Sequence, residues 1–314
     1  MLTPTLRLPP DPQGKKRRSK AKKEFENAFE RSSGRSAKKT IGGRFRLEGQ
    51  IGSGAMGKVY LAQDLQTKSQ IAVKLVNPVY ASKSAEDIAS EARIISKINH
   101  ENLVRILEAG VFDKDAFVAM ELLKGPDLRS YTDSSFRKNK SIPLDTVKKI
   151  ILQACSGLGA LHKNGIIHSD VKGENIIINA EGNVKIFDFE VSRFVFLDQI
   201  DEDETRTTGI IVGTPSHLSP EKAAGRDDFD HRSDIYSLGV VLYKMLCGLL
   251  PFDAEDTVEY LEKHRNELPI PPKERKPGLN ILKTAEEIVL KALEKDPSKR
   301  FQSMDEMRLA VEAV

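Results

Sequence analysis

The stretch that decides the fold is HSDVKGEN, residues 168–175, which lies between two apolar segments, 165–167 and 176–178, that predict short strands. It brings a carboxylate, an ammonium and an amide together within six residues. Asp170 can accept a proton from a substrate hydroxyl, and Lys172, two positions on, can neutralise a phosphoryl oxygen. Asn175 can ligate a metal ion. The stretch therefore predicts a catalytic loop.

A second carboxylate follows this loop in a strongly apolar setting. Asp188 lies thirteen residues after Asn175, in the segment IFDFE, residues 186–190. A carboxylate with apolar neighbours on both sides is costly to bury unless it is paired or binds a cation. Mg²⁺ is the hard, oxygen-seeking ion that suits Asn175 and Asp188, and Mn²⁺ is the alternative.

Upstream of the loop, the chain reads as short strands with a glycine cluster between the first two. The cluster is IGSGAMGKV, residues 51–59, and its backbone N–H groups could cradle phosphate oxygens. Alone it fits an ordinary hairpin turn equally well. It is not the dinucleotide-binding pattern, because a strand follows instead of a helix, and it lacks the Gly-Lys-Ser/Thr ending of a P-loop.

Lys74 lies on the next predicted strand, 17 residues after Gly57. A strand lysine usually faces solvent, but after a glycine loop an ammonium also suits the phosphates of a nucleotide. Glu91, on a predicted helix over 86–98, is the available carboxylate partner, with a solvated helix position as the alternative. Further strands are predicted at 103–112 and 116–122.

Helices dominate beyond residue 125. The clearest covers 144–162, where apolar residues recur at intervals of three and four and Asn164-Gly165 provides a stop. A second, at 233–247, is apolar almost all round and is expected at the centre of a domain. Others are expected near 255–265, 284–294 and 303–313. The fold class is therefore α+β, with two lobes and a cleft between them.

The net charge of +3 over 314 residues hides an uneven distribution. Residues 1–43 contain 12 Lys and Arg against 4 Asp and Glu, a net of +8, so the remainder carries −5. This arm has too few apolar residues to fold alone, and we expect disorder, with a helical turn or two at 20–31. A linker or docking arm is the default expectation, and an anionic membrane surface is the alternative. Without an array of aromatic residues for stacking, no nucleic acid partner is expected.

Composition also bears on the cellular location of the protein. Cys155 and Cys247 are too few for a disulfide framework and lack metal-ligand spacing. The most apolar run, 238–252, is about 15 residues long, short of the roughly 18 to 20 needed for a transmembrane helix. The first ten residues contain prolines and an Arg where an export signal needs apolar residues. We expect a cytoplasmic protein without a membrane span.

These elements, in this order, resemble a eukaryotic-type protein kinase, specifically the bacterial serine/threonine kinases. The resemblance covers about residues 44–313. It implies a bilobal fold, with a small antiparallel sheet and one helix in an N-lobe at 44–123 and a mainly helical C-lobe at 124–314, preceded by the arm at 1–43. It also implies transfer of the γ-phosphoryl group of ATP to Ser or Thr hydroxyls of proteins.

The resemblance assigns roles to individual residues. Asp170 is the catalytic base, Lys172 contacts the transferred group, and Asn175 and Asp188 hold magnesium. Lys74 pairs with Glu91 and with the nucleotide phosphates. Met120 is the gatekeeper, Glu121 and Leu123 offer hinge hydrogen bonds, and Asp127 reaches toward the ribose. The other residues implied to bind the nucleotide are Ile51, Gly52, Ser53, Gly54, Ala55, Met56, Gly57, Lys58, Val59 and Ala72.

Further signatures lie in the C-terminal half. The segment GTPSHLSPE, residues 213–221, resembles the end of an activation segment, where Thr214 and Lys172 are typical of serine/threonine kinases. Glu221 is expected to pair with Arg300. Asp234 matches the residue that braces the catalytic loop from the central helix.

Two positions depart from the family pattern. Ser169 replaces the arginine that usually precedes the catalytic Asp and anchors a phosphate on the activation loop. We therefore expect activity to depend little on phosphorylation of Thr205, Thr207 and Thr208. Glu190 replaces the glycine of Asp-Phe-Gly. Three readings stay open there: a conformation that any residue can adopt, a stiffened loop, or impaired catalysis.

Two other classes remain as alternatives to the kinase. One is a catalytically silent pseudokinase or nucleotide-binding scaffold, suggested by Glu190 and Ser169. The other is a small-molecule phosphotransferase of kinase-like fold, disfavoured by the segment 213–221, which builds a shelf for a peptide.

Overall fold

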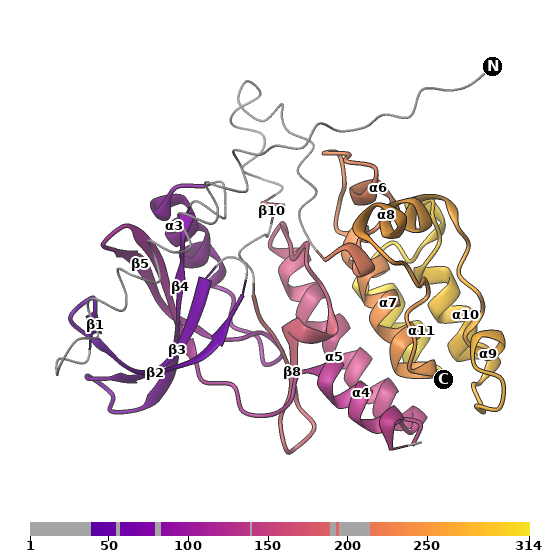
Figure 1. The fold of residues 1–314 in the computed structure, drawn as a ribbon, viewed down its shortest axis with the longest axis horizontal. Coiled ribbons are helices and arrows are strands. Elements are labelled where there is room, and N and C mark those ends of the chain that lie inside the picture. Colours follow the sequence, from indigo (N-terminus) through magenta and orange to yellow (C-terminus); the bar gives the residue numbers. More distant parts are fainter. Residues whose placement is uncertain (1–38, 55–56, 79–82, 139, 189–192, 195–213) are drawn as a thin grey trace. The chain divides into compact units, whose positions relative to one another are not determined.

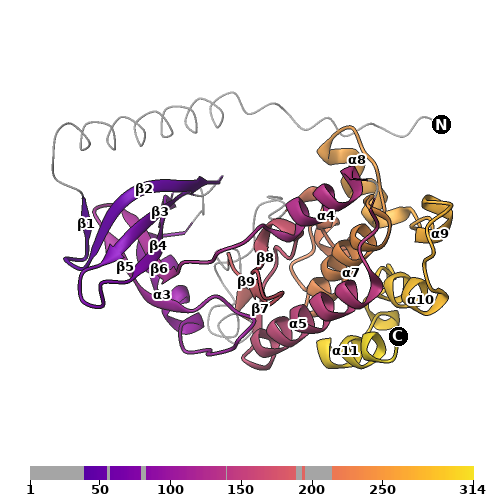
Figure 2. The ribbon, with the colours of Figure 1, turned by 90° about the horizontal axis from the view of Figure 1, so that it is seen from below.

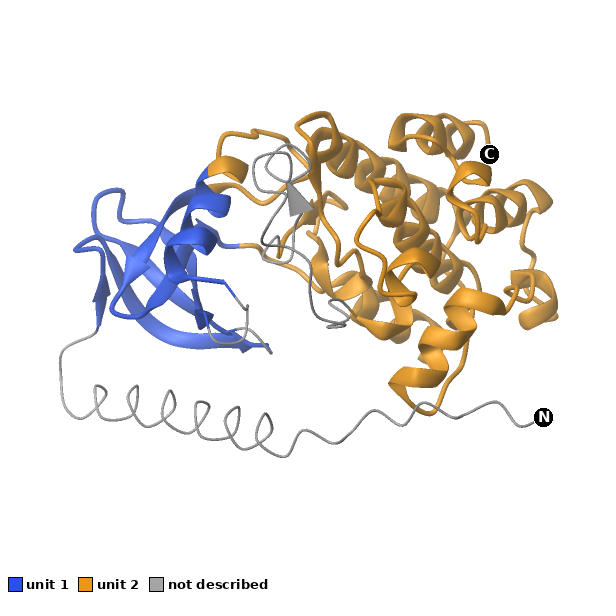
Figure 3. Cartoon of the chain, turned by 90° about the horizontal axis from the view of Figure 1, so that it is seen from above, with its two compact units in different colours: residues 1–93, 107–122 blue, residues 94–106, 123–314 orange. Residues whose placement is uncertain are grey.

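The structure, a computed structural model, describes residues 39–54, 57–78, 83–138, 140–188, 193–194 and 214–314. Its described residues divide into two compact units, those within 1–93 and 107–122 and those within 94–106 and 123–314 (Figure 3). Residues 94–106, expected in the first lobe, belong to the second unit. The reason is that Asn102 Nδ2 donates to the Val184 carbonyl at 3.0 Å and Leu103 forms a bridge with Ile186.

The first unit is built on a six-stranded sheet in the order β1-β2-β3-β4-β6-β5 (Figures 1 and 2). Alternate residues of its strands form one apolar cluster, which includes Phe45, Tyr60, Val73 and Phe117. On the other face, Ile88 of the helix packs against Val76. The elements are β1 (Thr40–Ile41), β2 (Phe45–Ser53), β3 (Gly57–Asp64), β4 (Gln70–Val76), α3 (Ala85–Ile95), β5 (Ile106–Phe112) and β6 (Asp115–Glu121).

Strand β1 corrects one expectation, because it lies in the segment assigned to the disordered arm. Ile41 is fully buried and pairs with Phe45 across a turn in which Gly42 and Gly43 have φ of 56° and 68°. Two successive positive φ angles suit glycine and bring the chain straight back on itself. The ordered part of the chain therefore begins before residue 44. The helical turns expected at 20–31 lie outside the described residues.

Helices form most of the second unit (Figure 1). Two short two-stranded sheets accompany them: β8 pairs with β9, and β7 with β10. The elements are α4 (Leu128–Arg137), α5 (Leu144–Lys163), β7 (Ile166–Ile167), η1 (Gly173–Asn175), β8 (Ile176–Ile178), β9 (Val184–Ile186), β10 (Arg193–Phe194), η2 (Pro215–His217), α6 (Pro220–Ala223), α7 (Arg232–Cys247), α8 (Thr257–Asn266), α9 (Pro272–Arg275), α10 (Lys283–Ala292), η3 (Pro297–Lys299) and α11 (Met304–Glu312).

The two main helices follow their sequence patterns. Helix α5 buries one face, through Val147, Ile151 and Leu158 among others, and ends at the predicted stop. Helix α7 is buried almost all round and terminates at Gly248, whose φ is 79°. Helices α10 and α11 cover α7 and α5 on the outside (Figure 2). This core supports the loop between β7 and β8, which contains Asp170.

Candidate active site

The polar groups of the catalytic loop converge on Asp170. Lys172 Nζ donates to Asp170 Oδ2 at 2.6 Å, while the backbone N–H and the hydroxyl of Thr214 donate to Oδ1 at 3.1 and 3.0 Å. Lys172 also donates to the Thr214 hydroxyl at 2.7 Å. The side chains of Asp170 and Lys172 are only 13% and 19% exposed. The structure thus unites three residues that are up to 44 positions apart in the sequence.

These contacts keep Asp170 ionised. Burial on its own would raise the pKa of Asp170, but the Lys172 charge and the hydrogen bonds from Lys172 and Thr214 outweigh it, so the pKa lies below its ordinary value. A carboxylate in this state is an acceptor for a proton at neutral pH.

Asn175 completes the cluster from the short η1 turn. Its Nδ2 donates to the Asp170 carbonyl at 2.9 Å and to Asp170 Oδ2 at 3.1 Å, and the residue is 4% exposed. Because the amide nitrogen makes these bonds, the Oδ1 atom is the one suited to a cation.

Asp188 reaches the same end of the β8–β9 hairpin. Ile176 pairs with Ile186, and the Phe187 N–H donates to the Asn175 carbonyl at 3.1 Å, so Asn175 and Asp188 emerge together. Asp188 has a φ of 72°, a left-handed conformation that costs a non-glycine residue about 1–3 kcal/mol and is concentrated at functional sites.

The donors at this hairpin end fit a magnesium ion. Among the described residues no group of three or more His, Cys, Asp or Glu is arranged to hold a metal. Mg²⁺ is usually bound by one or two protein oxygens together with substrate phosphates and water. An amide oxygen and one carboxylate suit that mode of binding and do not suit an all-protein metal cage.

Asp234, in the first turn of α7, holds the backbone of the catalytic loop by hydrogen bonds. Its carboxylate accepts from the N–H groups of His168 and Ser169 at 2.8 and 2.9 Å and contacts His162 Nε2 at 2.8 Å. Asp234 is 1% exposed. The expected bracing contact is present, and His162 is a partner that the sequence analysis did not identify.

Glu221 and Arg300 form the expected ion pair. Arg300 Nη1 and Nη2 donate to the two carboxylate oxygens at 2.8 and 2.7 Å, and Ser233 adds a hydrogen bond at 2.6 Å. Both residues are buried. Burial would raise the pKa of Glu221, but Arg300 more than offsets it and the pKa is lowered.

In the first unit, one face of the sheet gathers several residues assigned to nucleotide binding. Lys74 pairs across strands with Val59, and Ala72 pairs with Met120. Because residues two apart share a face and direct cross-strand partners point to the same side, these four side chains lie on one face. This face of the sheet is opposite the one that carries the apolar cluster of Phe45, Tyr60, Val73 and Phe117.

The glycines of the β2–β3 hairpin are not equivalent. A Cβ at Gly57 would lie 2.0 Å from the Leu75 carbonyl oxygen, so strand packing alone demands glycine there. At Gly52 the nearest atom would be at 3.7 Å, and at Gly54 nothing lies within 4 Å. Packing therefore does not explain Gly52 and Gly54. The Gly54 N–H itself donates to the Gly57 carbonyl at 2.9 Å and closes the hairpin.

Glu91 differs from expectation. Its carboxylate pairs with Lys83 Nζ at 2.6 Å in place of the expected Lys74. Lys83 lies eight residues upstream, just before α3, and its flexible side chain extends along the helix to Glu91. Burial raises the pKa of Glu91, an effect that Lys83 opposes.

The remaining assigned residues are placed as follows. Asp127 is the N-cap of α4 and accepts from the Ser130 N–H and hydroxyl at 2.8 and 2.7 Å. Ile51 is 52% exposed on β2. Glu121 ends β6, and Leu123 lies two residues beyond it. Ser53 and Lys58 face each other on β2 and β3. Outside the described residues lie Ala55, Met56, Glu190, Thr205, Thr207 and Thr208.

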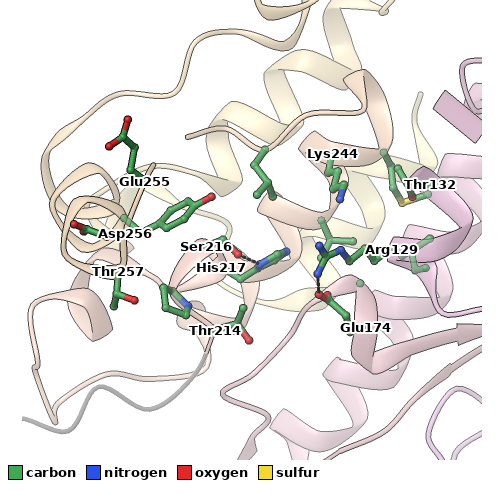
Figure 4. A pocket seen from close by; sticks show the side chains of 17 residues that line it. Arg129, Thr132, Glu174, Thr214, Ser216, His217, Lys244, Glu255, Asp256 and Thr257 are labelled. Carbon is green, nitrogen blue, oxygen red and sulfur yellow. Dashed lines mark hydrogen bonds and ion pairs between the residues drawn. The ribbon is translucent and has the colours of Figure 1, made fainter. Parts of the chain in front are cut away.

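A cavity of about 370 Å³ lies beside Thr214 in the second unit (Figure 4). Arg129 and Glu174, joined by an ion pair, line one side, and His217 forms part of the wall. Burial lowers the pKa of His217 to about 4, so the ring is neutral at pH 7. The cavity thus adjoins the residue that bonds to Asp170.

Comparison with known proteins identifies the family of this chain. The family model described as protein kinase domain matches residues 45–309. The chain belongs to the protein kinase family. Its sheet with one helix and its helical unit are the two lobes of that fold.

Several bacterial relatives are similar over most of the chain. The serine/threonine-protein kinase pkn3 of Myxococcus xanthus is 35% identical, over 88% of this chain and 51% of the relative. PknB of Mycobacterium leprae is 36% identical, over 84% and 42%, and PksC of Streptomyces coelicolor is 34% identical, over 85% and 48%. The chain therefore spans about half the length of these relatives. In its described part, no helix is long and apolar enough to cross a membrane.

Proposed function

We propose that this protein transfers the γ-phosphoryl group of ATP to serine or threonine hydroxyls of other proteins. The observation that carries the proposal is the cluster in which Asp170, ionised and buried, is held between Lys172 and Thr214. The names of the bacterial relatives support the choice of hydroxyl acceptors over tyrosine.

In this proposal Asp170 orients the acceptor hydroxyl and takes up its proton. Its lowered pKa keeps it in the acceptor form throughout the neutral range. Lys172, already in contact with Asp170, brings an ammonium beside the oxygens of the transferred group. Catalysis then comes chiefly from positioning and charge neutralisation.

Asn175 and Asp188 would hold Mg²⁺, with Mn²⁺ as the alternative. When bound, the ion neutralises phosphate charge and fixes the orientation of the nucleotide. The β8–β9 pairing supports this assignment, because it brings the backbone of Asn175 and of Asp188 to one end of the hairpin.

For the nucleotide, we assign the face of the sheet that carries Val59, Ala72, Lys74 and Met120. Val59 and Ala72 would contact the base, Met120 would be the gatekeeper, and Lys74 would reach the phosphates. The remaining assignments stand as proposed: backbone contacts at Glu121 and Leu123, ribose contact at Asp127, and the hairpin of residues 51–58 over the phosphates.

The acceptor protein would approach along the cavity beside Thr214. This cavity is the described space that adjoins the cluster of Asp170, and it is lined by both charged and apolar side chains. We also propose a cytoplasmic location and a docking role for the basic arm at 1–43, with no nucleic acid partner.

The decisive assay follows label from γ-labelled ATP into a generic basic protein, with and without magnesium. We expect wild type to incorporate label only with magnesium, and Asp170→Asn to reduce turnover by about 10²- to 10⁴-fold. Asp305→Asn, at an exposed position on α11, is the matched control and should stay within twofold.

The same assay distinguishes an active kinase from a catalytically silent, nucleotide-binding scaffold. If wild type and Asp170→Asn incorporate equally little label while both bind ATP, the fold serves as a scaffold and the kinase proposal fails.

A further inference from the structure

A buried lysine contacts the backbone of the catalytic loop. Lys222, on α6, is 9% exposed, and its Nζ donates to the backbone carbonyl of Ser169. Its ammonium also lies 5.2 Å from the ring centre of Phe229. Lysine is rarely buried to this degree unless its charge is compensated.

The surroundings of Lys222 supply that compensation. Burial lowers its pKa below the ordinary value. The carboxylates of Asp234, Asp170 and Glu221, in that order, oppose the shift by their charge. They come from α7, the catalytic loop and α6, so the ammonium is enclosed by negative charge on three elements.

The carbonyl that Lys222 holds belongs to the peptide unit that leads into Asp170. The N–H of the same peptide unit donates to His168 Nδ1 at 3.3 Å. A peptide unit is planar, so bonds at its carbonyl and its N–H together fix the orientation in which the chain enters Asp170. The N–H of Ser169, one unit earlier, is held by Asp234 at 2.9 Å.

This backbone needs restraint, because Ser169 has a φ of 69°. A non-glycine residue in this region is strained by about 1–3 kcal/mol and persists only when its surroundings enforce it. A change of φ at Ser169 would relieve the strain, but it would move the Ser169 carbonyl away from Lys222 and turn Asp170 away from Lys172 and Thr214. Position 169 is a serine, so the loop itself offers no cation there.

We propose that Lys222 is a positioning residue for Asp170, acting through the Ser169 carbonyl. The inference rests on the proposed kinase activity. The ammonium on α6 holds the carbonyl of the strained Ser169, while Asp234 holds its N–H, and this sets the direction of the catalytic carboxylate. Because the neighbouring Glu221 is fixed by Arg300, α6 is anchored to the core of the unit at one residue and holds the catalytic loop through the next, Lys222.

The test compares Lys222→Met with wild type and with Lys283→Met, a matched control whose lysine is 86% exposed on α10. Turnover, KM for ATP, affinity for a non-hydrolysable ATP analogue and the thermal midpoint are measured together. We expect kcat to fall about ten- to a hundredfold in Lys222→Met. KM for ATP and analogue affinity should stay within twofold, and the control should match wild type.

Turnover in Lys222→Met within twofold of wild type would overturn the proposal. An equal loss of nucleotide affinity and kcat would do the same, because it would show a general structural role. If Lys222→Met does not fold, Lys222→Gln is decisive: it keeps a neutral donor, and the proposal expects a folded protein with reduced kcat. Unfolding of both variants, or full turnover in the Gln variant, contradicts the proposal.

A failed kinase proposal would be recognised separately, since wild type would then be inactive. In that case amide hydrogen exchange is compared between wild type and Lys222→Met. Faster exchange confined to residues 168–172 supports the positioning role, and unchanged exchange in that segment rejects it.

Discussion

The catalytic loop of the second unit and the α3 carboxylate of the first unit are held in different ways. In the loop, Asp170 is enclosed by Lys172, Asn175 and Thr214, and the backbone is braced by buried side chains. Glu91, by contrast, forms one ion pair with Lys83, in which the side chains are 18% and 32% exposed.

The two cases show which local geometry is rigid and which can change within its own unit. A network of short bonds in a buried setting has no equivalent alternative, because any rearrangement leaves buried polar groups unpaired. A partly exposed ion pair contributes only about 0–1 kcal/mol and can be exchanged at little cost. We infer that the catalytic loop is preassembled and that the partner of Glu91 is the variable part.

The largest effect is expected from breaking the buried support of the second unit. Arg300→Met leaves the Glu221 carboxylate buried without its cation, so the free energy of unfolding should fall by about 3–5 kcal/mol. Urea titration measures this loss. Arg308→Met, which removes an exposed i,i+4 pair, should cost less than about 0.5 kcal/mol. A loss below 1 kcal/mol for Arg300→Met would mean that the pair does not support the unit.

Burial in the second unit also makes its stability depend on pH. His264 is fully buried, and burial, followed by the charge of Lys295, lowers its pKa to about 3. Between pH 6.5 and 3 the unfolded chain binds a proton that the folded chain does not, so stability falls as the pH falls through this window. His264→Gln should therefore reduce the loss of stability between pH 7 and 5 by on the order of 1 kcal/mol. Identical pH curves for the two proteins would contradict this origin.

A smaller effect is expected from changing the first unit. Lys83→Met removes the present partner of Glu91 and leaves the carboxylate available to Lys74. Because an ion pair this exposed is weak, kcat/KM should rise only about two- to fivefold. Lys114→Met, an exposed change in the same unit, is the control. A decrease in kcat/KM would show that the pair with Lys83 supports activity and does not compete with it.

Much of this site could be predicted from the sequence. Asp170, Lys172, Asn175 and Thr214 stand in short motifs whose spacing is maintained by the local backbone, and the structure brings them together. The pairs of Glu221 with Arg300 and of Asp234 with the loop backbone were also expected, because buried carboxylates need fixed partners. The strand and helix patterns placed the main elements correctly.

Other features were missed for physical reasons. Which lysine pairs with Glu91 depends on how far the flexible Lys83 side chain extends, and a sequence pattern does not indicate this. Lys222 follows a glutamate in a polar segment and looks like a solvated residue, although it is buried. Strand β1 is two residues long and is ordered mainly by pairing with β2, so composition alone pointed to disorder. Strand β9 is likewise too short for a periodic signal.

The most direct test of a preassembled catalytic loop is turnover in the absence of activation-loop phosphorylation. The triple variant with Thr205, Thr207 and Thr208 changed to Ala, treated with phosphatase, is compared with wild type under saturating ATP and acceptor. Because the loop is held from within its own unit, including through Lys222, we expect turnover within about threefold of wild type. A loss of about a hundredfold would contradict it.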